Sequence, residues 1–130
     1  MAVGTLLVAL AAGIAMAQVE PNGGTGTPPG AIDCDNDGKT RCEGTGQPDI
    51  IIGSSGRDII IAKEGGDIVN ASQRGRDDVF GNKDDDTLDV QDEEGNDFVD
   101  CGEGGEDQAF GGRGDKFTNY GSNVSRGGTA

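Results

Sequence analysis

The chain has 130 residues, a net charge of −14, 25 glycines, no histidine and only 4% aromatic residues. This composition excludes a large apolar core, and the acidic balance disfavours binding to nucleic acid or to anionic membranes. Without histidine, zinc chemistry and histidine-based hydrolysis are disfavoured as well. A hard cation such as Ca²⁺, which prefers oxygen ligands, would offset the charge repulsion of a folded acidic chain.

Residues 2–17 form an apolar run that ends in Ala15-Met16-Ala17, a pattern typical of a signal peptidase site. The run is short for a transmembrane helix, and no Lys or Arg precedes it. An N-terminal membrane anchor or a buried helix is the alternative. We expect residues 1–17 to be a signal peptide cleaved after Ala17, which predicts a secreted protein without membrane contact. Residues 18–32, rich in Gly, Pro and Thr, are expected to form a flexible leader.

Residues 33–43 are expected to form an acidic loop closed by cysteines. Cys34 and Cys42 flank a turn-prone segment, so a local disulfide is the simplest pairing in an exported protein. Cys101 is then left over. It is either free and buried or paired with another chain.

The same loop carries an alternating pattern of carboxylates. Asp33, Asp35 and Asp37 precede Gly38, and such an arrangement converges on one point in calcium-binding loops. An EF-hand requires Glu at the twelfth position, where this chain has Gly44. A calcium loop and a polar, disulfide-closed turn without metal are therefore equally favoured.

A repeat with a period near nine residues runs through residues 44–118. Each unit has a glycine-rich segment, an Asp, one further residue and then an apolar residue. The Asp column is Asp49, Asp58, Asp67, Asp77, Asp86, Asp97, Asp107 and Asp115. The apolar column is Ile51, Ile60, Val69, Val79, Leu88, Val99, Ala109 and Phe117. A disordered acidic linker would not show this regularity.

The repeat predicts short stacked strands. In a triplet such as Ile50–Ile52 the middle side chain faces opposite to its neighbours, so it can point inward. The glycine-rich segment makes the turn, and only stacking of neighbouring units buries so thin a core. We therefore expect an all-β parallel β-roll or β-solenoid of about eight degenerate units. Residues 119–130 are expected to form a disordered tail.

The outer residues of the triplets are expected to face outward. Ile50, Ile52, Ile59 and Ile61 are the apolar examples. They are either an ordinary strand surface or a patch covered by the Cys-closed loop, acting as a cap for the solenoid.

The unit GSSGRDIII, residues 53–61, resembles the repeat G-G-x-G-x-D-U-x-U (U, apolar) of RTX, or haemolysin-type, calcium-binding proteins. The resemblance covers about residues 44–118. It implies a β-roll with two units per coil and calcium in the turns between units two apart, held by turn carbonyl oxygens and Asp carboxylates. One edge would carry Asp49, Asp67, Asp86 and Asp107, and the other edge Asp58, Asp77, Asp97 and Asp115.

Departures from this pattern are expected to leave some sites weak. Ala62 and Ala71, for example, stand where the repeat has glycine, and several units carry extra residues. The best sites are expected between Asp58 and Asp77 and between Asp49 and Asp67, and the weakest near Asp86 and Asp115.

The sequence therefore predicts a secreted, non-enzymatic protein that folds on binding Ca²⁺ and has a structural or interaction role outside the cell. No G-x-S-x-G or H-E-x-x-H motif is present. The alternatives are a surface adhesin or self-associating solenoid, an accessory solenoid of a carbohydrate-active enzyme, and a disordered acidic calcium buffer. Cooperative folding distinguishes the buffer from the others, and turnover on polysaccharides would indicate the enzyme.

Overall fold

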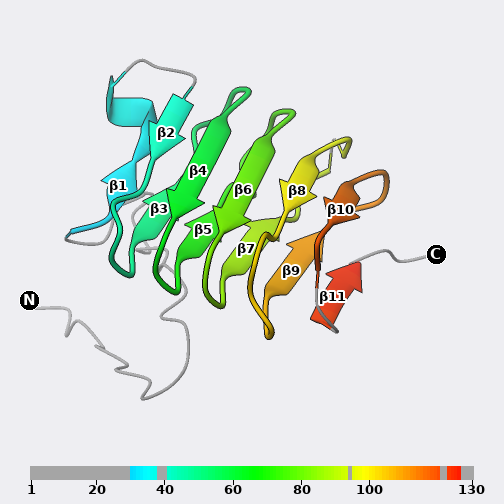
Figure 1. Ribbon diagram of the computed structural model, residues 1–130. Helices are drawn as coiled ribbons and strands as arrows, with labels where there is room; N and C mark the ends of the chain where they lie inside the picture. Colours follow the sequence, from blue (N-terminus) through cyan, green and yellow to red (C-terminus); the bar gives the residue numbers. More distant parts are fainter. Residues whose placement is uncertain (1–29, 38–40, 94, 121–122, 127–130) are drawn as a thin grey trace, which may run out of the picture.

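The computed structural model describes residues 30–37, 41–93, 95–120 and 123–126, and it shows an all-β parallel β-solenoid (Figure 1). This confirms the predicted fold class. The predicted signal peptide and the leader as far as residue 29 lie outside the described residues. In the part of the chain that is described, no helix is long and apolar enough to span a membrane.

Successive strands alternate between two sheets, so the chain winds as a flattened coil. Sheet A contains β1 (Ile32–Asp33), β3 (Ile50–Ile52), β5 (Ile68–Asn70), β7 (Thr87–Val90), β9 (Gln108–Gly111) and β11 (Asn123–Arg126). Sheet B contains β2 (Arg41–Glu43), β4 (Ile59–Lys63), β6 (Asp78–Asn82), β8 (Phe98–Asp100) and β10 (Lys116–Thr118). All pairings are parallel, and Ile51 pairs with Val69, which pairs with Leu88. Two repeat units therefore make one coil.

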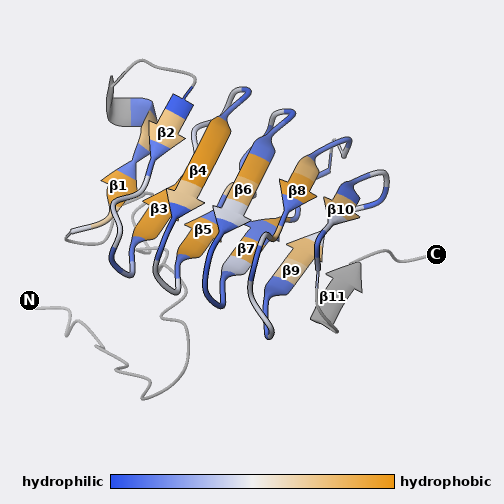
Figure 2. Ribbon diagram, in the orientation of Figure 1, coloured by the Kyte–Doolittle hydropathy of each residue, from blue (hydrophilic) through white to orange (hydrophobic). Residues whose placement is uncertain are grey.

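The predicted inward column forms the centre of the core. Ile51, Ile60 and Leu88 are fully buried, and every other member of the column is buried as well. The apolar residues follow the strands and the hydrophilic residues the turns, as Figure 2 shows. Ile50 and Ile52, on either side of Ile51, are only partly buried, as the alternation of a strand requires.

The core has a second inward column that the sequence interpretation missed. The first residue of each unit also faces the interior, because it lies two residues after the inward residue of the preceding strand. This first-position column is Gly44, Gly53, Ala62, Ala71, Gly81, Val90, Cys101 and Gly111, and all eight are buried. The alanines at 62 and 71, read from sequence as departures from the repeat, are thus core residues. The expectation of one inward side chain per strand holds for β3, β5, β8 and β10, but β4, β6, β7 and β9 each have two buried positions.

The N-terminal coil is closed by the predicted disulfide. Cys34 and Cys42 are bonded to each other and buried in the core, and Cys34 begins the short 3₁₀ helix η1 (Cys34–Asp37). The strands β1 and β2 flank this helix and pair with β3 and β4. The Cys-closed segment is therefore the first coil of the solenoid and covers its N-terminal end, rather than forming a separate loop.

The C-terminal segment and Cys101 are the two remaining features for which the sequence raised an expectation. The predicted disordered tail, residues 119–130, contains β11, which pairs in parallel with β9. Cys101 is free and buried at the end of β8, within the core. Of the two alternatives for this cysteine, the structure shows the free, buried one.

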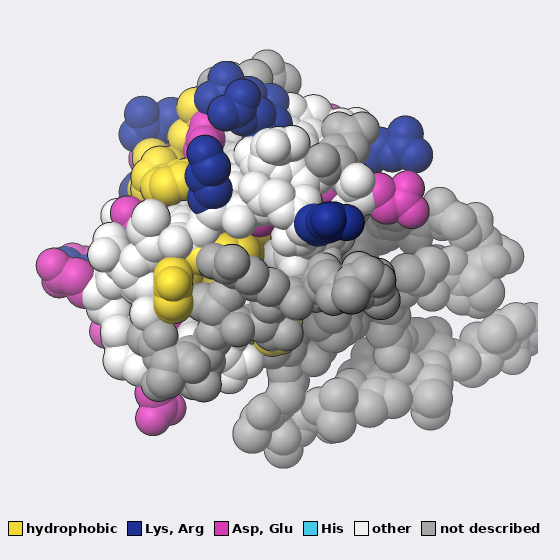
Figure 3. Space-filling view, turned by 90° about the vertical axis from the view of Figure 1, so that its right-hand side faces the viewer, with side chains coloured by type: hydrophobic (Ala, Val, Ile, Leu, Met, Phe, Trp, Pro, Cys, Tyr) yellow, Lys and Arg dark blue, Asp and Glu magenta, His cyan; other side chains and the backbone are white. Residues whose placement is uncertain are grey.

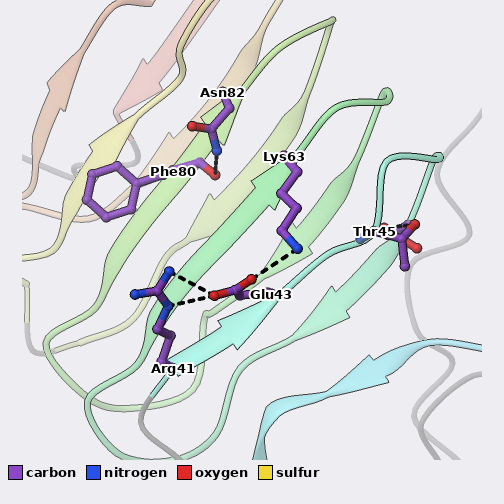
Figure 4. A network of polar contacts seen from close by, with 7 residues as sticks. Arg41, Glu43, Thr45, Lys63, Phe80 and Asn82 are labelled. Atoms are coloured by element: carbon purple, nitrogen blue, oxygen red, sulfur yellow. Dashed lines mark hydrogen bonds and ion pairs between the residues drawn. The ribbon is translucent and has the colours of Figure 1, made fainter.

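Exposed ion pairs join neighbouring coils on the outer face of sheet B. Glu43 on β2 lies 2.8 Å from Arg41 and 3.0 Å from Lys63 on β4 (Figure 4). Arg57 and Asp78 form a similar pair at 2.7 Å. Figure 3, which views the C-terminal side, also shows basic and acidic side chains interspersed on the surface. Because such pairs are exposed, water and salt screen them and each contributes little to stability.

Candidate cation-binding ladders of buried aspartates

The Asp column of the repeat points into the solenoid. Asp58, Asp67, Asp77, Asp86, Asp97, Asp107 and Asp115 are at most 8% exposed, and Asp49 at the N-terminal end is partly buried. These side chains alternate with the two apolar columns and share their inward direction. Carboxylates are rarely buried without partners, because desolvation of the charge is costly.

The aspartates line up in two columns, as the resemblance to the RTX repeat implied. The first ladder is Asp49, Asp67, Asp86 and Asp107, and the second ladder is Asp58, Asp77, Asp97 and Asp115. Within each ladder, the backbone N–H of one Asp donates to the Oδ1 of the Asp one coil later, at 2.8–3.0 Å. One oxygen of each later carboxylate is thus tied to the preceding coil, so the two ladders hold the coils in register.

The second carboxylate oxygen is unpartnered along most of both ladders. The Oδ2 atoms of Asp67, Asp86 and Asp107 in the first ladder, and of Asp77 and Asp97 in the second, are buried and accept no hydrogen bond. An unsatisfied buried polar group destabilises a fold by about 1–3 kcal/mol, and more when it is charged. The stack of five unpartnered oxygens therefore calls for a proton or a cation to neutralise it.

The other three ladder aspartates have protein donors for Oδ2. The backbone N–H and the hydroxyl of Thr45 donate to Asp49 Oδ2 at 2.6 and 2.9 Å. Ser54 donates to Asp58 through its N–H at 2.6 Å and through its hydroxyl. The N–H of Gly112 donates to Asp115 at 2.5 Å. The sequence interpretation did not identify these donors, although Gly44-Thr45 and Gly53-Ser54 share a visible pattern.

Burial of the ladders changes the acidity of their carboxyl groups. Burial raises the pKa of Asp77 and of Asp86 to about 7, and neighbouring carboxylates of the same ladder add to the effect. The pKa of Asp67 and of Asp97 rises to about 6, again mainly by burial. The backbone N–H bond to Oδ1 opposes the rise in each case but does not cancel it. Near neutral pH, these four carboxyl groups are therefore poised to exchange a proton for a cation.

Two acidic residues outside the repeat columns lie close enough to the ladders to act on them. Asp84 raises the pKa of Asp67 and Asp86 through charge repulsion, and its own Oδ2 accepts the N–H of Gly65 at 3.0 Å. Asp92 acts in the same way on the second ladder, at Asp77 and Asp97. Both are in irregular units, which is why the repeat pattern did not single them out.

Main-chain carbonyl oxygens converge on the same places as the carboxylates. A Cβ added to Gly81 would overlap both the unpartnered Oδ2 of Asp86 and the carbonyl oxygen of Cys101 in the next coil. A Cβ on Gly104 would likewise meet the carbonyl oxygen of Asp84 and the Oδ1 of Asp107. Such sets of carboxylate and carbonyl oxygens suit a hard cation. The residues present therefore fit calcium.

Side chains alone do not complete a coordination sphere at any one point. Among the described residues, no group of three or more acidic, Cys or His side chains is close enough to hold one ion. A cation between coils would therefore take its carboxylates in pairs from one ladder, with carbonyl oxygens and water as the remaining ligands.

The acidic segment of the N-terminal coil is used differently. The Oδ1 of Asp33 accepts the backbone N–H of Asp35 at 3.0 Å, so Asp33 caps η1. The backbone of Asp37 lies in the same helix. The first of the three predicted carboxylates thus has a structural role.

No protein-family model, curated protein or solved structure matches this chain. The geometry of the ladders therefore carries the functional proposal.

Proposed function

We propose that this is a secreted, non-enzymatic protein of the RTX-like type, which binds Ca²⁺ between its coils and folds as it does so. One observation carries the proposal: buried carboxylate oxygens without partners are stacked, coil upon coil, in two ladders. Ions placed between coils would neutralise them. The resemblance of residues 53–61 to the RTX nonapeptide supports the same conclusion.

The donor set favours calcium over other metals. The unpartnered atoms are all carboxylate oxygens, and the atoms that converge on them are carbonyl oxygens. Ca²⁺ accepts six to eight such ligands in flexible geometry, whereas Mg²⁺ requires a strict octahedron and keeps its water. Transition metals favour the His and Cys ligands that the ladders lack.

Charge couples binding to folding. The chain carries −14 overall, and folding brings seven of its aspartates into the interior. The solenoid has only a narrow apolar core to offset this repulsion. An ion that binds the folded chain but not the unfolded one stabilises it by mass action, so the binding energy becomes folding energy.

Secretion fits both the fold and the ion. The Cys34–Cys42 disulfide is compatible with an extracellular location, where disulfides persist. Extracellular calcium is plentiful enough to fill weak sites of this kind. Residues 1–17 remain the proposed signal peptide.

Circular dichroism in excess chelator and in millimolar calcium tests the proposal. We expect the full strand content only in calcium and a lower, less stable strand content in chelator, and magnesium at the same concentration should not replace calcium. The buried thiol of Cys101 provides a second readout, because a thiol reagent should label it quickly in chelator and slowly in calcium. Equal strand content and equal labelling in both conditions would rule the proposal out.

A second role, as an adhesin or self-associating solenoid, is favoured by the outer face of sheet B. Phe80 and Phe98 lie in adjacent coils with their ring centroids 6.0 Å apart, and Phe80 pairs in register with the partly buried Ile61. Apolar side chains gathered on an exposed face favour contact with another surface. Sedimentation in calcium tests this role: oligomers that dissociate when Phe80 and Phe98 are replaced by Ser would support it, and monomers would exclude self-association.

A further inference from the structure

Every ladder Asp whose Oδ2 reaches a protein donor has glycine at the first position of its unit, although glycine alone is not sufficient. In the units of Gly44, Gly53 and Gly111, Oδ2 lies 2.8–3.1 Å from the point where a Cβ would be. A side chain there would force the carboxylate to move. The missing side chain thus lets the carboxylate approach the next residue, Thr45, Ser54 or Gly112, and accept its N–H.

In every unit whose first residue has a side chain, the Oδ2 of the ladder Asp has no hydrogen-bond donor. Ala62, Ala71, Val90 and Cys101 precede Asp67, Asp77, Asp97 and Asp107 in their units, and each of these four aspartates has an Oδ2 without a donor. Gly81 precedes the fifth, Asp86. There Asn82 follows with a left-handed φ of 79°, and Asp86 Oδ2 accepts no hydrogen bond.

We infer that cations bind only between the inner coils, at Asp67–Asp86, Asp86–Asp107 and Asp77–Asp97, and that Thr45 and Ser54 replace the ion at the N-terminal end. This inference rests on the proposed function and assigns its sites. In these three pairs both carboxylates have an unpartnered, buried oxygen. Thr45 and Ser54 instead satisfy Asp49 and Asp58 with neutral donors, so the N-terminal coils close without a metal.

The resulting order differs from the one that the repeat pattern suggests. By consensus alone, the Asp49–Asp67 and Asp58–Asp77 pairs looked best and the region of Asp86 weakest. In the structure, the Oδ2 of one member of each of the first two pairs, Asp49 or Asp58, already accepts two hydrogen bonds. The close match of GSSGRDIII to the repeat therefore marks a coil that needs no ion.

Gly53→Ala tests the inference by addition of a site. Alanine already stands at this position in two other units, and a Cβ at Gly53 would lie 3.2 Å from the Cα of Ala71 in the next coil, a tight contact that a small shift relieves. The new Cβ would lie 3.0 Å from the Oδ2 of Asp58 and crowd it. We expect this crowding to favour the arrangement of the units that begin with Ala62 and Ala71, in which Oδ2 has no donor, and so to leave an unpartnered oxygen beside Asp77. Calorimetric titration of the protein with CaCl₂ should then report one more bound ion than in the wild type.

Asp97→Asn and Asp58→Asn form the matched pair for loss of a site. Asp97→Asn should remove the ion at Asp77–Asp97, lowering the stoichiometry by one. Asp58→Asn should leave the stoichiometry unchanged, and it should lower the melting temperature by the same amount in chelator and in calcium. Hydrogen exchange in chelator should show more protection in β2 and β4 than in β8.

The outcomes separate this inference from the proposed function. If the wild type binds no calcium, the proposed function fails. If it binds calcium but Asp58→Asn loses an ion, or Gly53→Ala gains none, the assignment of sites to the inner coils is wrong while calcium binding stands.

Discussion

A buried carboxylate destabilises a fold unless hydrogen bonds or a counter-charge satisfy it. Asp58 and Asp77, one coil apart in the second ladder, differ in this respect. Both are fully buried, but Ser54 donates to Asp58 Oδ2, whereas Asp77 Oδ2 has no donor. Replacement of each by Asn removes the charge and keeps the shape. The two substitutions therefore compare an unpartnered buried charge, at Asp77, with a hydrogen-bonded one, at Asp58.

Asp77→Asn is expected to stabilise the protein in chelator and to weaken its response to calcium. The Asn side chain keeps an acceptor for the N–H of Asp58 and removes a buried charge with an unpartnered oxygen. In urea unfolding at neutral pH, the free energy of unfolding in chelator should rise by about 1–3 kcal/mol. The increase that calcium adds should shrink.

Asp58→Asn is the control, and its effect should have the opposite sign. An amide NH₂ in the place of Oδ2 would face the N–H and hydroxyl of Ser54, so two donors would oppose each other. A loss of about 1–3 kcal/mol is expected in chelator. If both variants shift stability in the same direction, the unpartnered state of Asp77 is not what distinguishes them.

Gly75→Ala should destabilise the stacking of the turns. Gly75 has a φ of 147°, which L side chains rarely adopt, and an added Cβ would overlap the carbonyl oxygen of Gly56 in the preceding coil. We expect a loss of about 1–3 kcal/mol in thermal or urea unfolding. Gly105→Ala is the matched control, because a Cβ there meets nothing within 4 Å. Equal losses would show that the close approach at Gly75 is unimportant.

Among the elements, the N-terminal coil depends most on covalent closure. Its strands β1 and β2 contain two and three residues, and the Cys34–Cys42 disulfide closes the segment between them across a separation of eight residues. Strands this short contribute few hydrogen bonds. The disulfide instead restricts the unfolded state of the segment.

Replacement of both Cys34 and Cys42 by Ala should cost about 2–3 kcal/mol, as expected for so short a loop. The loss should appear first as faster hydrogen exchange in β2, because β4 beneath it remains paired with β6. Exchange in β8 and β10 is the internal control. Uniformly faster exchange in all strands would instead show that the N-terminal coil folds in one step with the rest.

The sequence predicted the elements that carry the repeat, because an apolar residue two positions after each Asp requires a strand with one inward centre. It also predicted the disulfide, whereas the two-unit coil and the two Asp columns were implied by the resemblance to the RTX repeat. Strands β1, β2 and β11 were missed because they lie outside the repeat, and their pairing is imposed by the coils beside them. Tertiary context decides such short strands rather than local pattern.

The direction of the Asp side chains could not be read from their spacing. The consensus places Asp in the turn, whereas a strand-like alternation carried one residue further back points it inward, beside Ile51 and its equivalents. The first-position column decides between the two directions. Its members, such as Ala62 and Val90, are buried, which shows that the inward alternation extends beyond the three-residue strand. Which oxygens remain unpartnered depends on backbone angles at single residues, such as Asn82, and no sequence pattern encodes these.

At the scale of the whole molecule, stability is a balance between a narrow core and a stack of like charges. Protons and cations are alternative ways to neutralise that stack. The two can be separated by pH, because the affected carboxyls change protonation in a range where their unfolded counterparts do not.

In chelator, the protein should become less stable as the pH rises from about 4 to about 7. Folding raises the pKa of Asp67 and Asp97 from 3.8 to about 6, and that of Asp77 and Asp86 to about 7, chiefly by burial. Between these values the folded chain holds protons that the unfolded chain has released. Folding therefore takes up protons, and a higher pH opposes it. This contribution to stability is fully present below about pH 4 and lost above about pH 7.

Calcium should reverse the trend, because the ion requires ionised ligands and competes with the protons. The urea midpoint, measured at half-unit pH steps, should fall with pH in chelator and hold or rise with pH in millimolar calcium, so that the two curves diverge above about pH 6. Asp77→Asn should flatten the chelator curve, since it removes one of the two carboxyls with the largest rise in pKa. A chelator curve that rises between pH 4 and 7 would mean that the buried oxygens are satisfied in the metal-free chain, and that neither protons nor cations are needed to close the solenoid.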